Sequence, residues 1–532
     1  MRNRLVAGLV RRGARSALSS SYRSFERRLE GPAASQAHLL EALTRDLART
    51  EYGRSLGLRE SETYDELVRK APIVTYDEFR PWIDRQASSE RPIVTSRPII
   101  IFEETSGSSG AHKLIPYTAA LLASFDRLFR IWVYDLLAYG PDLQSGKTFM
   151  SVSPAVRENR RTPSGVPIGF DDDTRYLSGL ARTLFGSRFL VVPGLSRVRD
   201  ISMYRRIIAA RLIAERDLEI ISIWSPTYLG SLLDFAAEHR TTLLRDLELG
   251  SIEVEDLQIP VGRRPDIVPI LDHAGPIEWP KVWPNLKLLS CWTDAAAALF
   301  IGRLRKELPG VVIQGKGLLA TEAPITLPLC RAPAPVPLLD EVFLEFESDE
   351  GDVRRLHELE DGREYGVIVS QKGGLTRYRM NDRVQVAGRY RATPCLRFVG
   401  RARSVSDLAG EKLHERFVRE ALGRVPIVAG TFTFLVPVPR PAGASHYLCI
   451  SDGDAGSNGE LGMALESKLE RAFQYRQARA LGQLGPLRTV LRRDAKERYT
   501  RHFLARGMKW GDIKYEALIS PVSETELEEL TS

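Results

Sequence analysis

The sequence PIIIFEETSGSSGAHK, residues 98–113, joins a strand pattern to a loop pattern. The apolar run PIIIF predicts a buried strand, and the polar, glycine-rich TSGSSGAHK that follows predicts a loop at its end. Glycines let successive backbone N–H groups turn inward, hydroxyls add donors, and a terminal lysine supplies positive charge. The segment from Thr105 to Lys113 is therefore either a cradle for a triphosphate or an ordinary flexible linker.

Outward from this loop, strand patterns alternate with helix patterns. Before the loop, a helix is predicted from Tyr64 to Lys70, and after it a long helix is predicted from Thr118 to about Ala138. The predicted strands are TFMSV (148–152), RFLVV (188–192), EIISIW (219–224), LKLLSCW (286–292) and GVVIQ (310–314), and the predicted helices between them are 203–214, 228–238 and 295–307. Such alternation predicts an α/β fold with a largely parallel sheet.

The pattern changes twice in the second half of the chain. Short alternating strands with tight turns occupy residues 342–400 and predict a β-rich subdomain. A different mixture of strands and helices follows, so we place a domain boundary at about 400–404. The predicted organisation is a basic amphipathic helical segment (1–34), a large domain (35–400) and a small, mobile α+β domain (404–532).

Composition excludes several classes of protein. With 43% hydrophobic and 27% charged residues, the chain has the make-up of an ordinary globular protein. The longest uncharged run, residues 425–439, contains three prolines and is too short to span a bilayer. The 4 cysteines are widely spaced, which argues against a disulfide framework and favours a reduced, cytoplasmic protein. The histidines show no zinc-binding spacing.

The positive charge is concentrated at the amino terminus. The net charge is +7, but residues 1–30 carry eight arginines and two glutamates. The rest of the chain is near neutral, so nucleic acid is not an expected partner. The same segment has apolar residues at helical spacing, and it is open whether this helix packs on its own domain, touches a membrane surface or serves as a targeting signal.

Two further segments place chemically active side chains beside predicted strands. Thr321 and Glu322, in LLATE, follow the strand VVIQ, where ligands of α/β sheets bind. The pair can bind a nucleotide and Mg²⁺, or it can be a helix N-cap threonine followed by a glutamate that favours the helix dipole. Asp382, in YRMND, ends one predicted strand and turns into the next, a position from which its carboxylate can accept ribose hydroxyls. Lys412, in GEK, lies just beyond the predicted boundary, as a mobile cation.

Together the three segments, in this order, resemble the acyl-adenylating superfamily that includes firefly luciferase and the acyl-CoA synthetases. Within it, the chain is most similar to the auxin-responsive Gretchen Hagen family of acyl acid–amino acid ligases, which also has bacterial members. Four more stretches carry the resemblance: RTEYGRSLGL (49–58), PIVTYDEFRPWIDR (72–85), WSPTYL (224–229) and WPNLKLLSCW (283–292).

The resemblance implies a role for each candidate residue. The phosphate loop would comprise Thr105, Ser106, Gly107, Ser108, Ser109, Gly110 and Lys113. Thr321 would contact the nucleotide, Glu322 would bind Mg²⁺ and Asp382 would bind the ribose, with Arg401 of FVGR also at the nucleotide. Lys412 and Lys514, the latter in GDIKYE, would approach the α-phosphate. Two residues depart from the family pattern: Leu318 replaces an aromatic residue that often stacks on adenine, and Asn381 replaces a glycine of the ribose motif.

The activity implied is that of an ATP- and Mg²⁺-dependent ligase. It would adenylate a small carboxylic acid in the large domain and transfer the acyl group to an amine, above all an amino acid, with release of pyrophosphate and AMP. Two alternatives stay open: formation of a thioester with coenzyme A, and a nucleotide-binding or scaffold protein that has lost turnover. The identity of the acid is not encoded in any short motif.

Overall fold

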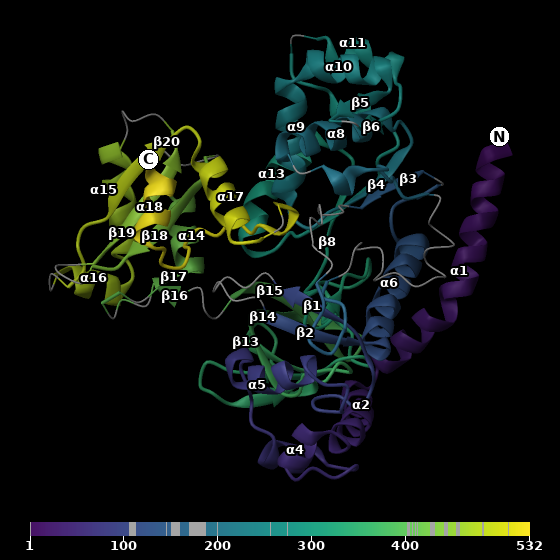
Figure 1. Cartoon of the computed structure of the whole chain (residues 1–532), viewed down its shortest axis with the longest axis vertical. Helices are drawn as coiled ribbons and strands as arrows, with labels where there is room; N and C mark the ends of the chain where they lie inside the picture. The colour runs from purple at the N-terminus through teal and green to yellow at the C-terminus, as the bar shows by residue number, and fades with distance from the viewer. Residues whose placement is uncertain are drawn as a thin grey trace. The chain divides into compact units, whose positions relative to one another are not determined.

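The structure is a computed structural model of the chain (Figure 1). It describes residues 2–105, 113–144, 146–150, 160–169, 188–198, 200–255, 257–273, 275–401, 405–406, 408–409, 411, 413–425, 431–440, 445–453, 458–480, 483–508 and 510–532. The chain divides into two compact units, whose main boundary lies between Val399 and Gly400; Ala295–Ala297 also belong to the second unit.

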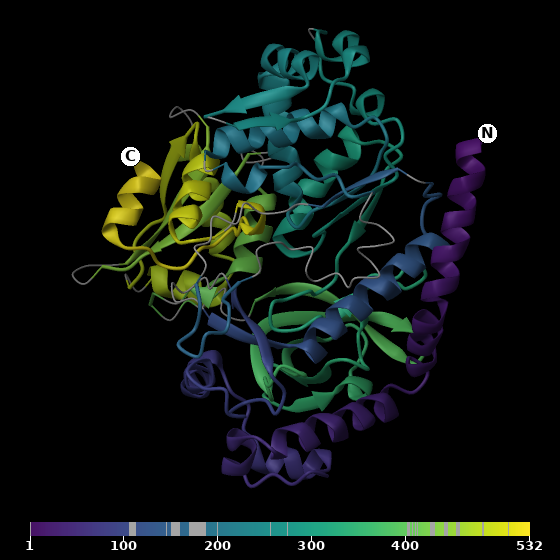
Figure 2. The same ribbon diagram turned by 45° about the vertical axis from the view of Figure 1, so that its right-hand side comes forward.

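The first unit begins with the basic helix α1 (Arg2–Arg28). Its buried side chains, Ala14, Leu18, Tyr22 and Phe25, recur every three or four residues and form one face of the helix. This face packs against α6 (Ala119–Tyr139), and the two helices lie side by side in Figures 1 and 2. From Ala14 onward, the helix is therefore packed on its own unit. Among the described residues, no helix is long and apolar enough to cross a membrane.

Four short helices follow α1. They are α2 (Pro32–Ala48), α3 (Glu51–Ser55), α4 (Tyr64–Lys70) and α5 (Tyr76–Ala87). A capping box begins α4: the Glu66 N–H donates to the Thr63 hydroxyl, and the Thr63 N–H donates to the Glu66 carboxylate at 2.9 Å. This local signal explains why the sequence predicts the start of α4 correctly.

The glycine-rich segment joins two strands of an antiparallel hairpin. Strand β1 (Ile99–Thr105) pairs with β2 (Lys113–Thr118), and Thr105 lies opposite Lys113. Helix α6 then begins at Thr118, whose hydroxyl accepts a hydrogen bond from the Leu121 N–H. The sequence predicted the strand β1 and the helix α6 but missed β2.

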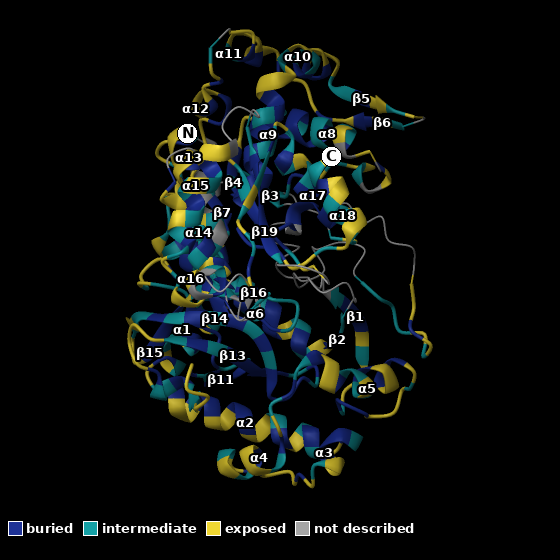
Figure 3. Ribbon diagram, turned by 90° about the vertical axis from the view of Figure 1, so that its left-hand side faces the viewer, coloured by how far each residue is buried: buried dark blue, intermediate teal, exposed yellow. Residues whose placement is uncertain are grey.

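The parallel sheet expected from the sequence is present. It contains β3 (Lys147–Met150), β4 (Leu218–Ser222), β7 (Leu288–Cys291) and β8 (Val312–Gly315), in the order β3-β4-β7-β8. All three pairings are parallel. Figure 3 shows buried residues along β4 and β7, as expected of a sheet with helices on its faces. The α/β prediction is confirmed, whereas the predicted strand 188–192 is wrong: within it, Phe189 makes an isolated bridge to Thr148.

Helices and a small hairpin surround this sheet. They are α8 (Ile201–Ala214), α9 (Pro226–Glu238), α10 (Arg240–Leu249), β5 (Ser251–Val254), β6 (Leu257–Pro260), α11 (Val268–Leu271), α12 (Trp279–Val282) and α13 (Ala298–Glu307).

An antiparallel sheet completes the first unit. Its strands are β11 (Phe343–Glu347), β12 (Val353–Arg355), β13 (Glu364–Ser370), β14 (Tyr378–Tyr390) and β15 (Thr393–Arg401), in the order β12-β11-β13-β14-β15. A short pair, β9 (Thr326–Leu327) and β10 (Val336–Pro337), precedes it. Buried residues of this sheet, of β1 and β2 and of α1, α2 and α5 form one hydrophobic core.

The second unit, from Gly400 to Ser532, has its own hydrophobic core. Its sheet has the order β18-β19-β20, with an antiparallel and then a parallel pairing. The strands are β16 (Val405–Ser406), β17 (Leu413–His414), β18 (Thr433–Val438), β19 (His446–Asp452) and β20 (Arg488–Arg492). The helices are α14 (Glu415–Gly423), α15 (Asn458–Leu469), α16 (Phe473–Ala480), α17 (Ala495–Ala505) and α18 (Glu524–Thr531).

Candidate nucleotide and acyl site

Lys113 is the first residue of β2 and ends the candidate phosphate loop. Its Nζ donates a hydrogen bond to the Tyr378 hydroxyl at 3.2 Å and lies 5.4 Å from the centre of the Tyr76 ring. The Tyr76 hydroxyl in turn accepts a hydrogen bond from the Leu114 N–H at 2.7 Å. Two tyrosines from α5 and β14 therefore fix the carboxyl end of the loop. Ser106, Gly107, Ser108, Ser109 and Gly110 lie outside the described residues, as does the side chain of Thr105.

Thr321 and Glu322 form the tip of a tight turn. The Ala320 N–H donates to the Ala323 carbonyl at 3.1 Å, and the Ala323 N–H donates to the Ala320 carbonyl at 3.2 Å. The Tyr117 hydroxyl, on β2, donates to the Thr321 carbonyl at 2.6 Å. The next element is the strand β9, so the helix-cap interpretation of Thr321 and Glu322 is wrong. Glu322 is half-buried at this turn.

Asp382 lies inside β14, and the prediction that it ends a strand is wrong. Gly366 of β13 faces Arg383 and Ile368 faces Arg379, so β14 carries extra residues at this point, a β-bulge. Asn381 has a φ of 63° there. Asparagine tolerates this left-handed conformation better than other side-chain-bearing residues, which explains how it can replace a glycine. The bulge changes the direction of the strand next to Asp382, and Asp382 is 6% exposed.

The strand β2 links all three motifs. Lys113 contacts Tyr378, the first residue of YRMND, and Tyr117 contacts Thr321 of LLATE. Side chains four residues apart on a strand lie on the same face, so one strand holds both neighbouring segments. The role of Tyr117 is not predicted from the sequence, because an isolated tyrosine in KLIPYT carries no signal of its distant partner.

Leu318, which stands where an aromatic residue is expected from the family resemblance, packs against the hydrophobic core of the first unit. Its N–H donates to the Thr326 hydroxyl at 2.7 Å. Arg401 is the last residue of β15, and its side chain lies outside the described residues.

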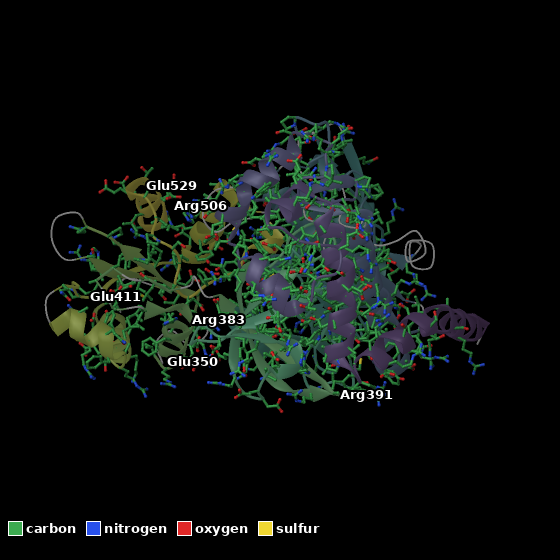
Figure 4. The ribbon with its side chains drawn as sticks, turned by 90° about the horizontal axis from the view of Figure 1, so that it is seen from below. Glu350, Arg383, Arg391, Glu411, Arg506 and Glu529 are labelled. Carbon is green, nitrogen blue, oxygen red and sulfur yellow. The ribbon has the colours of Figure 1, made fainter. Side chains whose placement is uncertain are left out.

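Lys412 also lies outside the described residues, but its neighbour Glu411 is described (Figure 4). The buried Glu411 carboxylate accepts hydrogen bonds from the Leu408 and Ala409 N–H groups, each at 2.7 Å, and from the Tyr447 hydroxyl. Burial raises the pKa of Tyr447, so this hydroxyl keeps its proton. Glu411 therefore anchors the residues immediately before Lys412, a role that the motif GEK does not reveal.

Lys514 lies in a loop that Tyr499 holds. The Tyr499 hydroxyl donates to the Lys514 carbonyl at 2.8 Å and accepts from the Glu516 N–H at 3.0 Å. Burial raises the pKa of Tyr499 well above its ordinary value, which keeps this hydroxyl neutral. Its ring packs against Phe434 and Tyr515, so the backbone around Lys514 is tied to the core of the second unit.

We expect Tyr499→Phe to weaken this attachment while the ring stays packed. The loss of two hydrogen bonds to buried backbone should cost about 1–2 kcal/mol of unfolding free energy. The rate of acyl-adenylate formation should fall several-fold with little change in the KM for ATP. Thermal unfolding and pyrophosphate release measure the two effects. An unchanged rate in a destabilised variant would show that the hydroxyl serves stability alone.

The donor set at Glu322 is compatible with Mg²⁺. This ion keeps several water ligands and is commonly bound through one or two carboxylates together with substrate phosphates. Within the described part of the chain, no three His, Cys, Asp or Glu side chains form a metal cage. A single carboxylate beside a triphosphate is enough for such a site.

Comparisons with known proteins show which family the chain resembles. The GH3 family N-terminal domain matches residues 21–313, more than half of the chain, and the GH3 family central domain matches residues 337–401. The indole-3-acetic acid-amido synthetase GH3.8 of Oryza sativa subsp. indica is 26% identical in an alignment that covers 88% of this chain and 85% of that protein.

Two solved structures share the fold. The AtGH3.15 acyl acid amido synthetase in complex with 2,4-DB has a TM-score of 0.82 at 20% identity and covers 97% of this chain and 96% of that chain. The 2-hydroxyisobutyryl-CoA ligase in its postadenylation state has a TM-score of 0.55 at 12% identity and covers 95% and 93% of the two chains. With more than half of its length matched by the family's N-terminal domain and the central domain following in order, the chain belongs to the GH3 family.

Proposed function

We propose that this GH3 chain is an ATP-dependent ligase that adenylates a carboxylic acid and joins the acyl group to the amino group of an amino acid. The observation that carries the proposal is the strand β2, which ties the end of the phosphate loop to the ribose motif and to the turn of Glu322. The relatives named above as amido synthetases support the amide product.

In this proposal, the residues of the first unit bind and orient ATP. The loop from Thr105 to Lys113 holds the phosphates, and Lys113 adds a positive charge whose position Tyr378 and Tyr76 fix. Asp382 accepts the ribose hydroxyls. Glu322 would hold Mg²⁺, which when bound neutralises phosphate charge.

The reaction then takes two displacement steps. A carboxylate oxygen of the acid attacks the α-phosphorus and pyrophosphate leaves; the amine then attacks the acyl carbon and AMP leaves. Negative charge grows around the α-phosphorus in the first step, and prepositioned cations stabilise such charge. We assign this role to Lys412 and Lys514 of the second unit, which we propose to be mobile.

Pyrophosphate release from ATP in the presence of aryl, aliphatic and amino acids tests the adenylation step. We expect one class of acid to stimulate release and Mg²⁺ to be required. If no acid in the panel stimulated pyrophosphate release, the result would favour a nucleotide-binding protein without turnover.

The acceptor is tested with one accepted acid, a mixture of amino acids and coenzyme A. Mass spectrometry should find an amide as the product. A thioester as the sole product would overturn the amide proposal and leave the adenylation proposal standing.

A further inference from the structure

Lys316 lies at the carboxyl edge of the parallel sheet, directly after β8. Its Nζ donates a hydrogen bond to the hydroxyl of Ser222, the last residue of β4, at 2.8 Å. Because β7 lies between β4 and β8, the Lys316 side chain crosses the end of β7. This edge is where open α/β sheets bind their ligands.

Two indole rings flank the Lys316 ammonium group. Nζ lies 5.1 Å from the centre of the Trp224 ring and 6.0 Å from the centre of the Trp132 ring. The Trp132 ring is itself fixed, because its Nε1–H donates to the Gln314 side-chain oxygen at 2.8 Å. Aromatic faces attract a cation and offset part of its cost of burial.

Lys316 has no carboxylate partner in an ion pair within the described parts of the chain. Burial lowers its pKa to about 8. Glu219 lies at the amino end of β4, away from this edge, and its carboxylate accepts the Gln144 and Gly146 N–H groups. An ammonium in such a place is costly unless an acceptor joins it.

The residues around Lys316 also line a cavity. Ser222 and Trp132, which contact the ammonium, form part of the wall of a mostly apolar cavity of about 90 Å³ between α6 and the strands β3 and β4. Most of the other wall residues are apolar, among them Phe129, Leu136, Met150 and Ile220, and three are charged: Arg130, Arg188 and Glu219. The cavity therefore has a mostly apolar body, and Ser222 is the part of its wall that contacts the Lys316 ammonium group. Its size favours a compact acid over a long acyl chain.

We propose that this cavity binds the body of the acyl acid and that Lys316 selects acids carrying a second oxygen acceptor, a hydroxyl or a further carboxylate, besides the carboxylate that is adenylated. The inference rests on the proposed function, because it names the substrate class of the same reaction. The ammonium, Ser222 and the two indoles provide a hydrogen bond, a charge and two flat surfaces for a short acid or one with a single ring.

Matched pairs of acids test the proposal. Each pair has the same ring or short chain, with and without one hydroxyl or one extra carboxylate. Adenylation by the wild-type protein should prefer the substituted member in kcat/KM by about tenfold or more, the effect of leaving a buried polar group unpaired. Lys316→Met should reduce that preference at least tenfold, and Lys316→Arg should keep more of it. The pairs that differ by a hydroxyl and the pairs that differ by a carboxylate show separately which of the two acceptors Lys316 recognises.

Lys287 supplies the control. It is exposed at the beginning of β7, on the opposite edge of the same sheet, so Lys287→Met should leave the preference unchanged. Thermal unfolding checks that each variant folds. If Lys316→Met does not fold, Lys316→Gln, which keeps a hydrogen-bond donor for Ser222, replaces it in the test. Calorimetric binding of the acid pairs without ATP gives a second readout.

Three results would overturn the inference. If Lys316→Met lowered kcat/KM equally for both members of each pair, Lys316 would act on the reacting carboxylate or on the fold. An unchanged preference in a folded Lys316→Met protein would make Lys316 structural. A wild-type protein that adenylates both members equally would exclude the selection while leaving the proposed function intact, whereas failure to adenylate any acid would contradict the proposed function itself.

Discussion

Replacing Lys514 by methionine is expected to lower the rate of acyl-adenylate formation about 100- to 1000-fold, the scale of removing one prepositioned donor of transition-state charge. The Tyr499 hydroxyl bonds the Lys514 carbonyl and the Glu516 N–H, so the backbone from which the Lys514 side chain extends is held in place. Methionine keeps an unbranched side chain and removes the ammonium. Single-turnover pyrophosphate release with saturating ATP and acid measures the loss.

Lys468→Met is the matched control. Lys468 lies in the last turn of α15, also in the second unit, and its replacement removes the same charge from that unit. We expect a near-normal rate from it. If both variants lost activity equally, the general charge of the unit would be responsible; if Lys514→Met kept its rate, Lys514 would not be the cation at the α-phosphate.

Glu322→Gln is expected to remove Mg²⁺-dependent adenylation and to leave the fold intact. The turn that carries Glu322 is held by the backbone hydrogen bonds between Ala320 and Ala323 and by the Tyr117 hydroxyl, and all of these remain in the variant. Glutamine has nearly the same shape, but a neutral amide is a much weaker ligand for a hard cation. Pyrophosphate release titrated with Mg²⁺, together with thermal unfolding, separates the two effects.

Glu350→Gln makes the corresponding change on the surface of the same unit. Glu350 (Figure 4) is exposed. It forms an ion pair with Arg363 at 3.3 Å. Exposed pairs contribute little to stability, so this variant should behave like the wild type. If the Glu322→Gln variant released pyrophosphate at the wild-type rate and at the same Mg²⁺ concentration, Glu322 would be a structural residue of the turn.

The elements predicted well from the sequence are those with strong local signals. Helix α4 begins at a capping box, and α6 begins at a threonine N-cap before a long apolar pattern. The runs that became β4, β7 and β8 are apolar and bounded by turns, so they were predicted as strands. Each of these signals lies within a few residues of the element that it specifies.

The errors have the opposite cause. Strand β2 contains Pro116 and has no clear alternation, and it is a strand because it pairs with β1 across the loop. The run 188–192 looks more like a strand, yet the structure gives it a single bridge, at Phe189. Strand formation depends on a partner, and partners are chosen by the whole fold.

By itself, the sequence determined the order of the three motifs, the α/β class and the family resemblance, because these depend on short runs of residue types. The tertiary structure alone decided that Tyr117 holds Thr321, that Tyr378 holds Lys113 and that Lys316 crosses the sheet edge to Ser222. The residues of each pair are separated by 94 to 265 positions in the chain. Contacts over such separations arise from the packing of strands and helices against one another, and no local pattern encodes them.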